Sequence, residues 1–103
     1  MTDAQTPVIV INTITLNQPS DAQIVANLQL ELVARLKSTW PGFLGQKTLI
    51  ARDGATVATI ETWATFETLL DIVKAPLLLE YRQRIQAYGA LSPVLYQEAK
   101  ASE

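Results

Sequence analysis

An amide inside an apolar segment is the first candidate for chemistry in this 103-residue chain. Asn12 interrupts a run, from Val8 to Leu16, that consists otherwise of valine, isoleucine, threonine and leucine. Burying an amide costs free energy unless hydrogen-bond partners satisfy it. Asn12 therefore either faces a pocket and binds the hydroxyl or carbonyl of a substrate, or lies at a strand end where the backbone satisfies it.

Glu61 and Trp63 are two residues apart, so they share one face of a strand. The indole of Trp63 offers a flat wall for an aromatic substrate and one N–H donor, and an ordinary core tryptophan is the alternative. If apolar neighbours bury Glu61, the pKa of its carboxyl rises and the group becomes a base near neutral pH. The alternative for Glu61 is a charge at the rim of the sheet.

The last helical segment carries Tyr81, Arg82, Arg84 and Tyr88. We predict that Arg84 holds a phenolate or enolate and that Tyr81 donates a proton, which makes both substrate-binding residues. An amphipathic helix whose arginines extend to solvent is the alternative. Phe66 and Glu61 are also predicted to bind substrate, Phe66 as part of a dry wall with Val10, Ile14, Leu28 and Leu70.

Histidine and cysteine are both absent from the sequence. The chain therefore lacks the most common general base at neutral pH, the most common metal ligand and the usual proximal haem ligand. It also lacks a thiol nucleophile, a thiolate metal site and disulfides. We expect no metal site, so that catalysis must use carboxylates, phenols, amides, indoles or the substrate itself.

Charge and hydropathy exclude several classes of partner. The net charge is −2, whereas a nucleic-acid binder normally has a basic face. No apolar run approaches the length of a membrane span, and the first residues lack the positive charge of a secretory signal. We expect a cytoplasmic protein with no nucleic-acid or membrane partner. Hydrophobic residues make up 49% of the chain, and this surplus predicts a subunit interface.

Four segments have the composition of strands. They are rich in β-branched and other apolar residues and are bounded by turn residues: Pro7–Leu16, Phe43–Arg52, Thr56–Ala64 and Pro93–Ala99. Asp53-Gly54 predicts a hairpin between the second and third strands. The first strand is apolar on both faces, which favours a central place in the sheet, and Pro93 favours an edge for the last strand.

Helices are predicted between these strands. Apolar residues at helical spacing follow Ser20, the predicted cap, and the helix should end at Trp40-Pro41-Gly42. Thr65 is predicted to cap a second helix, Pro76 to begin a third, and Gly89 to end the third.

This order of elements is the split βαβ arrangement. It predicts one α+β, ferredoxin-like domain over residues 1–103, with a four-stranded antiparallel sheet and with residues 1–6 disordered. Helices should cover one face of the sheet. The other face needs a cover as well, and we predict a homodimer in which the sheet of a second copy supplies it.

Three features in this order resemble the antibiotic-biosynthesis-monooxygenase family. They are Asn12 late in the first strand, Pro41-Gly42-Phe43-Leu44-Gly45 at the second, and Glu61-Thr62-Trp63 at the end of the third. The resemblance extends from Val8 to Tyr96 and implies a dimeric α+β barrel. It also implies oxidation of an aromatic polycyclic phenol or anthrone by O₂ without flavin, haem or metal, with Asn12 and Trp63 as the catalytic positions.

The sequence departs from the family at two places. The haem-degrading branch uses a histidine on the later helices, which this chain lacks. Quinone-forming members often have a second asparagine shortly before the tryptophan, where this chain has Thr59. A non-catalytic dimeric barrel that binds a hydrophobic small molecule therefore stays an alternative, as does a dimerisation domain without a ligand. The lack of aromatic residues in the first strand argues against an RNA-recognition module.

Overall fold

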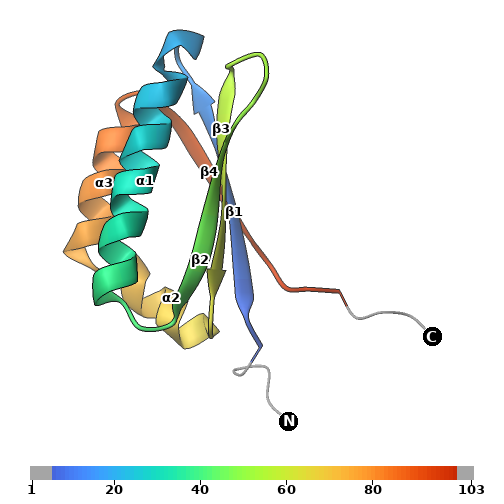
Figure 1. Ribbon diagram of the computed structural model, residues 1–103, viewed down its shortest axis with the longest axis vertical. Helices are drawn as coiled ribbons and strands as arrows, with labels where there is room; N and C mark the ends of the chain where they lie inside the picture. Colours follow the sequence, from blue (N-terminus) through green and yellow to red (C-terminus); the bar gives the residue numbers. More distant parts are fainter. Residues whose placement is uncertain (1–5, 100–103) are drawn as a thin grey trace.

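The computed structural model describes residues 6–99 and shows one antiparallel sheet with helices on a single face (Figure 1). The strand order is β2-β3-β1-β4. The four strands are β1 (Val8–Leu16), β2 (Phe43–Ile50), β3 (Thr56–Trp63) and β4 (Gly89–Tyr96). The predicted ferredoxin-like α+β fold is confirmed, with the first and third strands central and the last at an edge. Of residues 1–6, for which disorder is predicted, residues 1–5 lie outside the described part.

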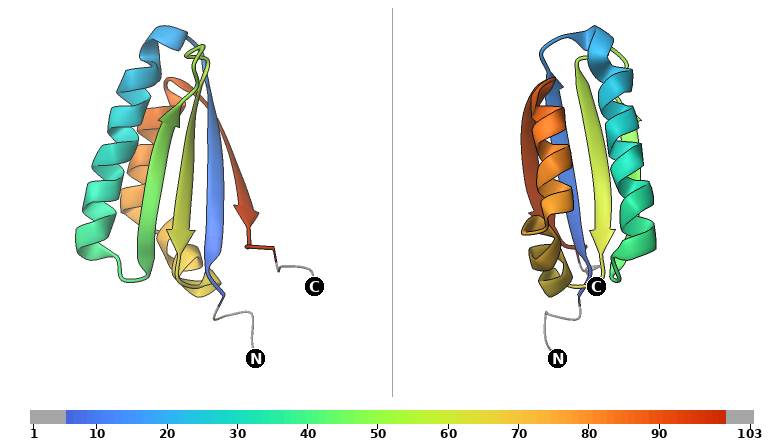
Figure 2. Two further views of the ribbon diagram at one scale, coloured as in Figure 1. Left: turned by 45° about the vertical axis from the view of Figure 1, so that its right-hand side comes forward. Right: turned by 90° about the vertical axis from the view of Figure 1, so that its left-hand side faces the viewer.

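Three helices cover the sheet: α1 (Ala22–Thr39), α2 (Phe66–Val73) and α3 (Pro76–Gln86). Figure 2 shows α1 and α3 side by side over the strands, with α2 at the end where β3 finishes. Oγ1 of Thr65 accepts a hydrogen bond from the backbone N–H of Thr68 at 3.2 Å, which confirms the predicted cap of α2. Pro76 begins α3 as predicted, because its fixed φ suits a first helical turn.

The start of α1 differs from the prediction. Ser20 does not cap the helix; it lies inside a short 3₁₀ turn, η2 (Pro19–Asp21), and Asp21 is the residue before α1. Proline at the first position of η2 starts this turn one residue before Ser20. The predicted cap at Ser20 was therefore wrong.

The last strand begins earlier than predicted. Gly89 is the first residue of β4 and pairs with Leu16, instead of ending α3. A Cβ at Gly89 would collide with the carbonyl oxygen of Thr15, so the close approach of two strands requires glycine there. Pro93 pairs with Asn12 on an edge strand, where its missing N–H leaves the sheet intact.

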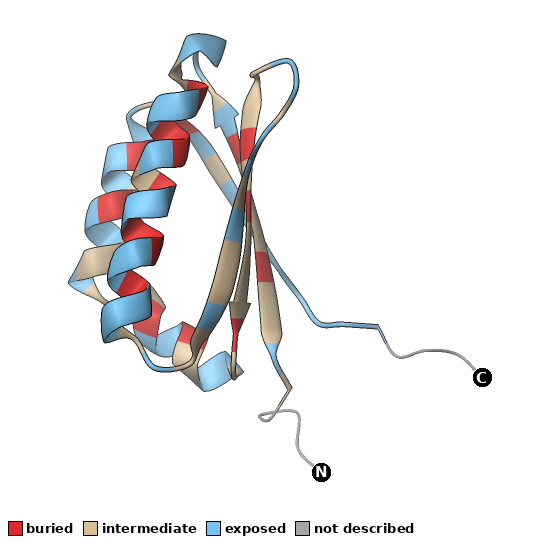
Figure 3. Cartoon of the chain, viewed as in Figure 1, coloured by how far each residue is buried: buried red, intermediate tan, exposed pale blue. Residues whose placement is uncertain are grey.

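The register of the strands sorts side chains between two faces. Val10, Asn12 and Ile14 of β1 face the helices, and Asn12 lies opposite Thr59 of β3. Buried residues form two apolar clusters, one around Trp63 and one around Ile14. Figure 3 shows them as red bands where helices and strands meet. The buried polar side chains thus lie in the layer between the sheet and the helices.

No described segment of the chain covers the opposite face of the sheet. It presents apolar side chains from all four strands, among them Ile9, Ile11, Leu49, Ile60 and Val94. Leu49 and Val94 are exposed, and the three isoleucines are partly exposed. Within residues 6–99, no helix has both the length and the apolar character needed to cross a bilayer.

Candidate active site

A cavity of about 140 Å³, here called the inner cavity, lies between the sheet and the helices. Its walls are mostly aliphatic and come from β1, β3, β4 and all three helices. Asn12, Gln29, Glu61, Trp63 and Arg82 are the polar or amphipathic side chains that line it. A mainly apolar cavity with a few convergent polar groups is typical of small-molecule sites.

Two neighbouring side chains on the helix-facing side of the sheet have buried oxygen atoms without hydrogen-bond partners. Oδ1 of Asn12 and Oγ1 of Thr59 have no hydrogen-bond partner among the described residues. They belong to directly opposed residues of β1 and β3. Buried polar atoms are almost always satisfied in folded proteins, and an exception points to a ligand, an ion or water. Asn12 therefore offers a free acceptor to a molecule in the inner cavity.

Gln46 on β2 adds a third atom of this kind. Its Nε2 is buried without a partner, while its Oε1 accepts a hydrogen bond from Oγ1 of Thr48 at 2.8 Å. Gln46 lies opposite Glu61 in the sheet. Polar groups thus continue from Asn12 across β3 to β2, and apolar clusters lie around them.

Glu61 and Trp63 are joined by a hydrogen bond. Nε1 of Trp63 donates to Oε1 of Glu61 at 3.3 Å, and the Trp63 side chain is only 1% exposed. Phe43 packs edge-on against the indole, with ring centroids 5.0 Å apart, and fixes its orientation.

Burial raises the pKa of the Glu61 carboxyl above its ordinary value. The Trp63 hydrogen bond and the charge of Arg82 act in the opposite direction. A carboxyl with a raised pKa next to an aromatic wall can accept a proton from a weakly acidic substrate. No cluster of three or more potential metal ligands occurs in residues 6–99.

The structure brings Asn12, Glu61 and Trp63 together and leaves the other predicted site residues outside. Tyr81 is buried between α1 and α3, and its hydroxyl donates to Glu31 of α1. Arg84 lies over this ring, 5.0 Å from its centroid, and its Nη1 is 3.6 Å from Oε2 of Glu31. Tyr81 and Arg84 thus connect α1 and α3, and neither lines the inner cavity.

The predicted dry wall is only partly found. Val10 lines the inner cavity, whereas Ile14 belongs to the other apolar cluster. Leu28 is partly buried against both clusters. Phe66 is 43% exposed at the start of α2 and faces a different groove, and Leu70 is exposed as well. The wall is instead built from side chains of α1, α2, α3 and β4 in the immediate surroundings of Trp63.

Two residues of the inner cavity were not predicted as site residues. Gln29 is 3% exposed and lies four residues after Val25 and three before Leu32, so helical spacing marks it as a polar residue on the buried stripe of α1. Arg82 lines the inner cavity in place of Arg84. Two helical residues two positions apart point in nearly opposite directions, and the rotation of α3 decides which one faces inward.

Comparison with known proteins gives structural relatives. No protein-family model and no curated protein sequence matches the chain. SnoaB, a cofactor-independent oxygenase from Streptomyces nogalater, is 19% identical over 93% of this chain and 96% of its own, with a TM-score of 0.76. The ActVA-Orf6 monooxygenase from Streptomyces coelicolor, solved with nanaomycin D, is 18% identical over 98% of this chain and 95% of its own, with a TM-score of 0.81.

A third structure is described as an antibiotic biosynthesis monooxygenase. It is 21% identical over 90% of this chain and 99% of its own, with a TM-score of 0.75. All three structural similarities cover almost the whole of this chain and of the related chain, as the order of motifs in the sequence predicts. The chain therefore has the fold of the antibiotic biosynthesis monooxygenases.

Proposed function

We propose that this protein is a monooxygenase that oxidises an aromatic polycyclic phenol or anthrone with O₂ and uses no flavin, haem or metal. The observation that carries this proposal is the inner cavity, where Asn12, Glu61 and Trp63 meet beside unpartnered buried oxygen atoms. A fold shared with SnoaB, a cofactor-independent oxygenase, supports it.

In this proposal the polar groups of the inner cavity orient the substrate. Oδ1 of Asn12 accepts a hydrogen bond from a substrate hydroxyl that Glu61 does not deprotonate, and the indole of Trp63 packs against an aromatic ring. The guanidinium of Arg82 balances the negative charge that develops when the substrate is deprotonated. Aliphatic side chains around these groups exclude water, so that each electrostatic interaction is stronger than it would be in solvent.

The reaction begins with a proton transfer to Glu61. Its carboxylate takes a proton from the phenol hydroxyl or from the methylene group of an anthrone, which leaves an electron-rich anion. The anion passes one electron to O₂, and the substrate radical and superoxide combine through a new C–O bond. The proton held by Glu61 converts this peroxide into a hydroperoxide.

Loss of water completes the oxidation. Glu61 removes the remaining proton from the oxygenated carbon, the O–O bond breaks, and hydroxide leaves and takes up that proton. A quinone carbonyl and one molecule of water result. One atom of O₂ thus enters the product and the other leaves as water, and the substrate supplies all the electrons.

We further propose that the protein is a homodimer formed through the uncovered face of the sheet. Apolar side chains of all four strands are available there, and burying them would remove them from water. Two sheets packed face to face would complete a dimeric α+β barrel. We propose that the reaction takes place in the cytoplasm. Fractionation of cells that express a tagged form of the protein tests this location.

Oxygen uptake is the experiment that tests the proposed reaction. Metal-stripped protein is offered anthrones, naphthols and hydroquinones in an oxygen electrode, and ¹⁸O₂ is used to count the oxygen atoms that enter the product. The test variant combines Asn12→Ala with Trp63→Phe. Its matched control combines Asn27→Ala with Trp40→Phe, which make the same changes outside the inner cavity.

We expect uptake by the wild type and the control, one labelled oxygen atom in the product, and a loss of at least about a hundredfold in the test variant. Equal turnover by both double variants would rule out the proposed site. Tight binding of these compounds without oxygen uptake would instead identify a non-catalytic binding protein. Thr59 favours that role, because it stands where quinone-forming members often have a second asparagine.

A further inference from the structure

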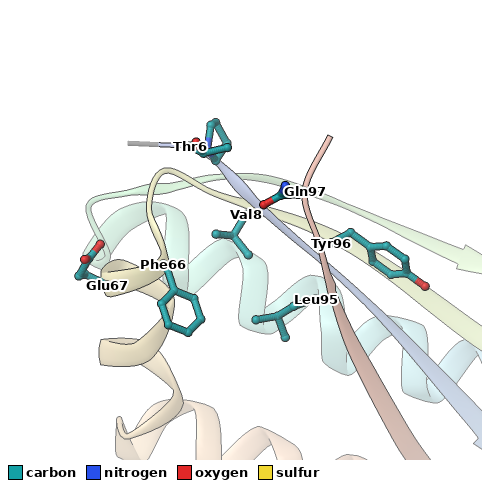
Figure 4. A pocket seen from close by; sticks show the side chains of 8 residues that line it. Thr6, Val8, Phe66, Glu67, Leu95, Tyr96 and Gln97 are labelled. Atoms are coloured by element: carbon teal, nitrogen blue, oxygen red, sulfur yellow. The ribbon is translucent and has the colours of Figure 1, made fainter. Parts of the chain in front are cut away.

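A second, open depression lies next to the inner cavity, at the end of the sheet where β1 begins (Figure 4). This outer groove has a volume of about 410 Å³. Its walls come from the start of β1, the end of β4 and the start of α2. Figure 4 shows the side chains of Val8 and Leu95 directed toward Phe66, whereas the ring of Tyr96 points to the other side. Polar residues stand at its rim: Thr6, Glu67 and Gln97.

The outer groove and the inner cavity share a wall. Leu95 lines both of them. Val8 of the groove and Val10 of the cavity are successive residues on the helix-facing side of β1, and Val8 lies opposite Trp63. The two sites are therefore adjacent, and their apolar walls meet at Leu95.

The size of the inner cavity limits what it can hold. An apolar protein cavity of about 150 Å³ accommodates one benzene molecule. The inner cavity, at about 140 Å³, is thus suited to a single aromatic ring. Any larger substrate must place its other rings elsewhere, and the outer groove offers apolar walls directly beyond Leu95.

We propose that the outer groove is a second binding subsite, which holds the apolar remainder of an elongated aromatic substrate whose hydroxylated ring occupies the inner cavity. Phe66 and Leu95 then determine which substrates fit. The inference rests on the proposed function in that it places the reacting ring beside Asn12. It adds that the rings beyond the reacting one extend past Leu95 into the outer groove.

Calorimetric titration with two phenols tests the subsite. Phenol fills the inner cavity alone, and 4-phenylphenol carries a second ring in line with the first. Phe66→Ala removes a wall of the outer groove. Leu79→Ala is the matched control, since Leu79 of α3 is 44% exposed, like Phe66, but lines neither site.

The wild type and the Leu79→Ala control should bind 4-phenylphenol at least about tenfold more tightly than phenol. Phe66→Ala should lose about tenfold in affinity for 4-phenylphenol and less than about twofold for phenol, because Phe66 lines the outer groove and not the inner cavity. Equal affinities of the wild type for the two phenols would overturn the second subsite, as would a Phe66→Ala variant that weakens the binding of both ligands alike. If either result is found but phenol binds the wild type, the proposed function still stands. If phenol does not bind the wild type, the second subsite and the proposed function are both overturned.

Discussion

Trp63 donates a hydrogen bond from its indole nitrogen to Oε1 of Glu61 at 3.3 Å, and both side chains line the inner cavity. The buried indole thus holds a carboxyl whose pKa burial has raised. The two residues act as one unit, because moving the ring also moves the acceptor of its N–H. Changes at Trp63 should therefore alter the chemistry of Glu61 in addition to the shape of the cavity.

Replacing Glu61 with glutamine should remove a pH-dependent loss of stability. Burial raises the pKa of Glu61 above its ordinary value of 4.5, so the folded protein binds this proton more tightly than the unfolded chain does. The contribution of the protonated Glu61 carboxyl to the free energy of unfolding is complete below pH 4.5. It is lost as the pH rises through the raised pKa that Glu61 has in the folded protein. Relative to Glu61→Gln, the free energy of unfolding of the wild type should therefore fall above pH 4.5.

Urea denaturation of both proteins at a series of pH values measures this difference. The pKa of Glu31 is lowered, chiefly by the hydroxyl of Tyr81, and its effect cancels because both proteins contain it. A difference in stability that stays constant from about pH 4 to about pH 8 would show that the Glu61 carboxyl is not perturbed by folding.

Thr59→Val should stabilise the protein, although most substitutions in a core do the opposite. Oγ1 of Thr59 is buried without a hydrogen-bond partner, and valine keeps the shape without the hydroxyl. We expect the free energy of unfolding to rise by about 1 kcal/mol. Thr48→Val is the matched control, because it removes a hydroxyl that donates to Gln46 and should lower the free energy by about 1 kcal/mol. Destabilisation of similar size by both would mean that Thr59 has a partner in solution.

Arg82 and Arg84 should differ in their effect on oxygen uptake. The charge of Arg82 lowers the pKa of Glu61, so Arg82→Gln should raise that pKa further and shift the rising limb of the pH–rate profile to higher pH. Arg84→Gln removes an exposed pair with Glu31 outside the cavity, so it should leave the profile unchanged and alter stability by less than about 1 kcal/mol. The reverse pattern would assign the cavity arginine to position 84, as predicted from the sequence.

Ile60→Lys should convert the proposed dimer into a monomer. Ile60 lies on the uncovered face of central strand β3, opposite Ile11 of β1, so a lysine there would place a charge in the middle of the interface. Light scattering after size-exclusion chromatography measures the mass. Leu79→Lys, on the helix side, is the control and should leave the mass unchanged. A wild type that elutes as a monomer at all concentrations would contradict the interface.

Local rules account for much of the fold. The Asp53-Gly54 hairpin is found as predicted: Gly54 has a φ of +75°, and Oδ1 of Asp53 accepts the N–H of Ala55 at 2.9 Å. Thr65 and Pro76 begin the helices assigned to them, because capping and the fixed φ of proline act within one helical turn. The start of β4 could not be found this way, because Gly89 is required by a close approach of Thr15, which lies far away in the sequence.

Asn12, Glu61 and Trp63 meet because strands alternate strictly between two faces and neighbouring strands pair in register, so their positions in the sequence already placed them on one side of the sheet. No comparable rule predicts which helical side chains face the inner cavity. Whether Arg82 or Arg84 faces inward, whether Gln29 reaches the cavity, and whether Phe66 lines it or the outer groove all depend on how each helix rotates and shifts on the sheet. Packing of all the helices against the sheet decides that rotation, so the spacing of residues along the chain does not predict it.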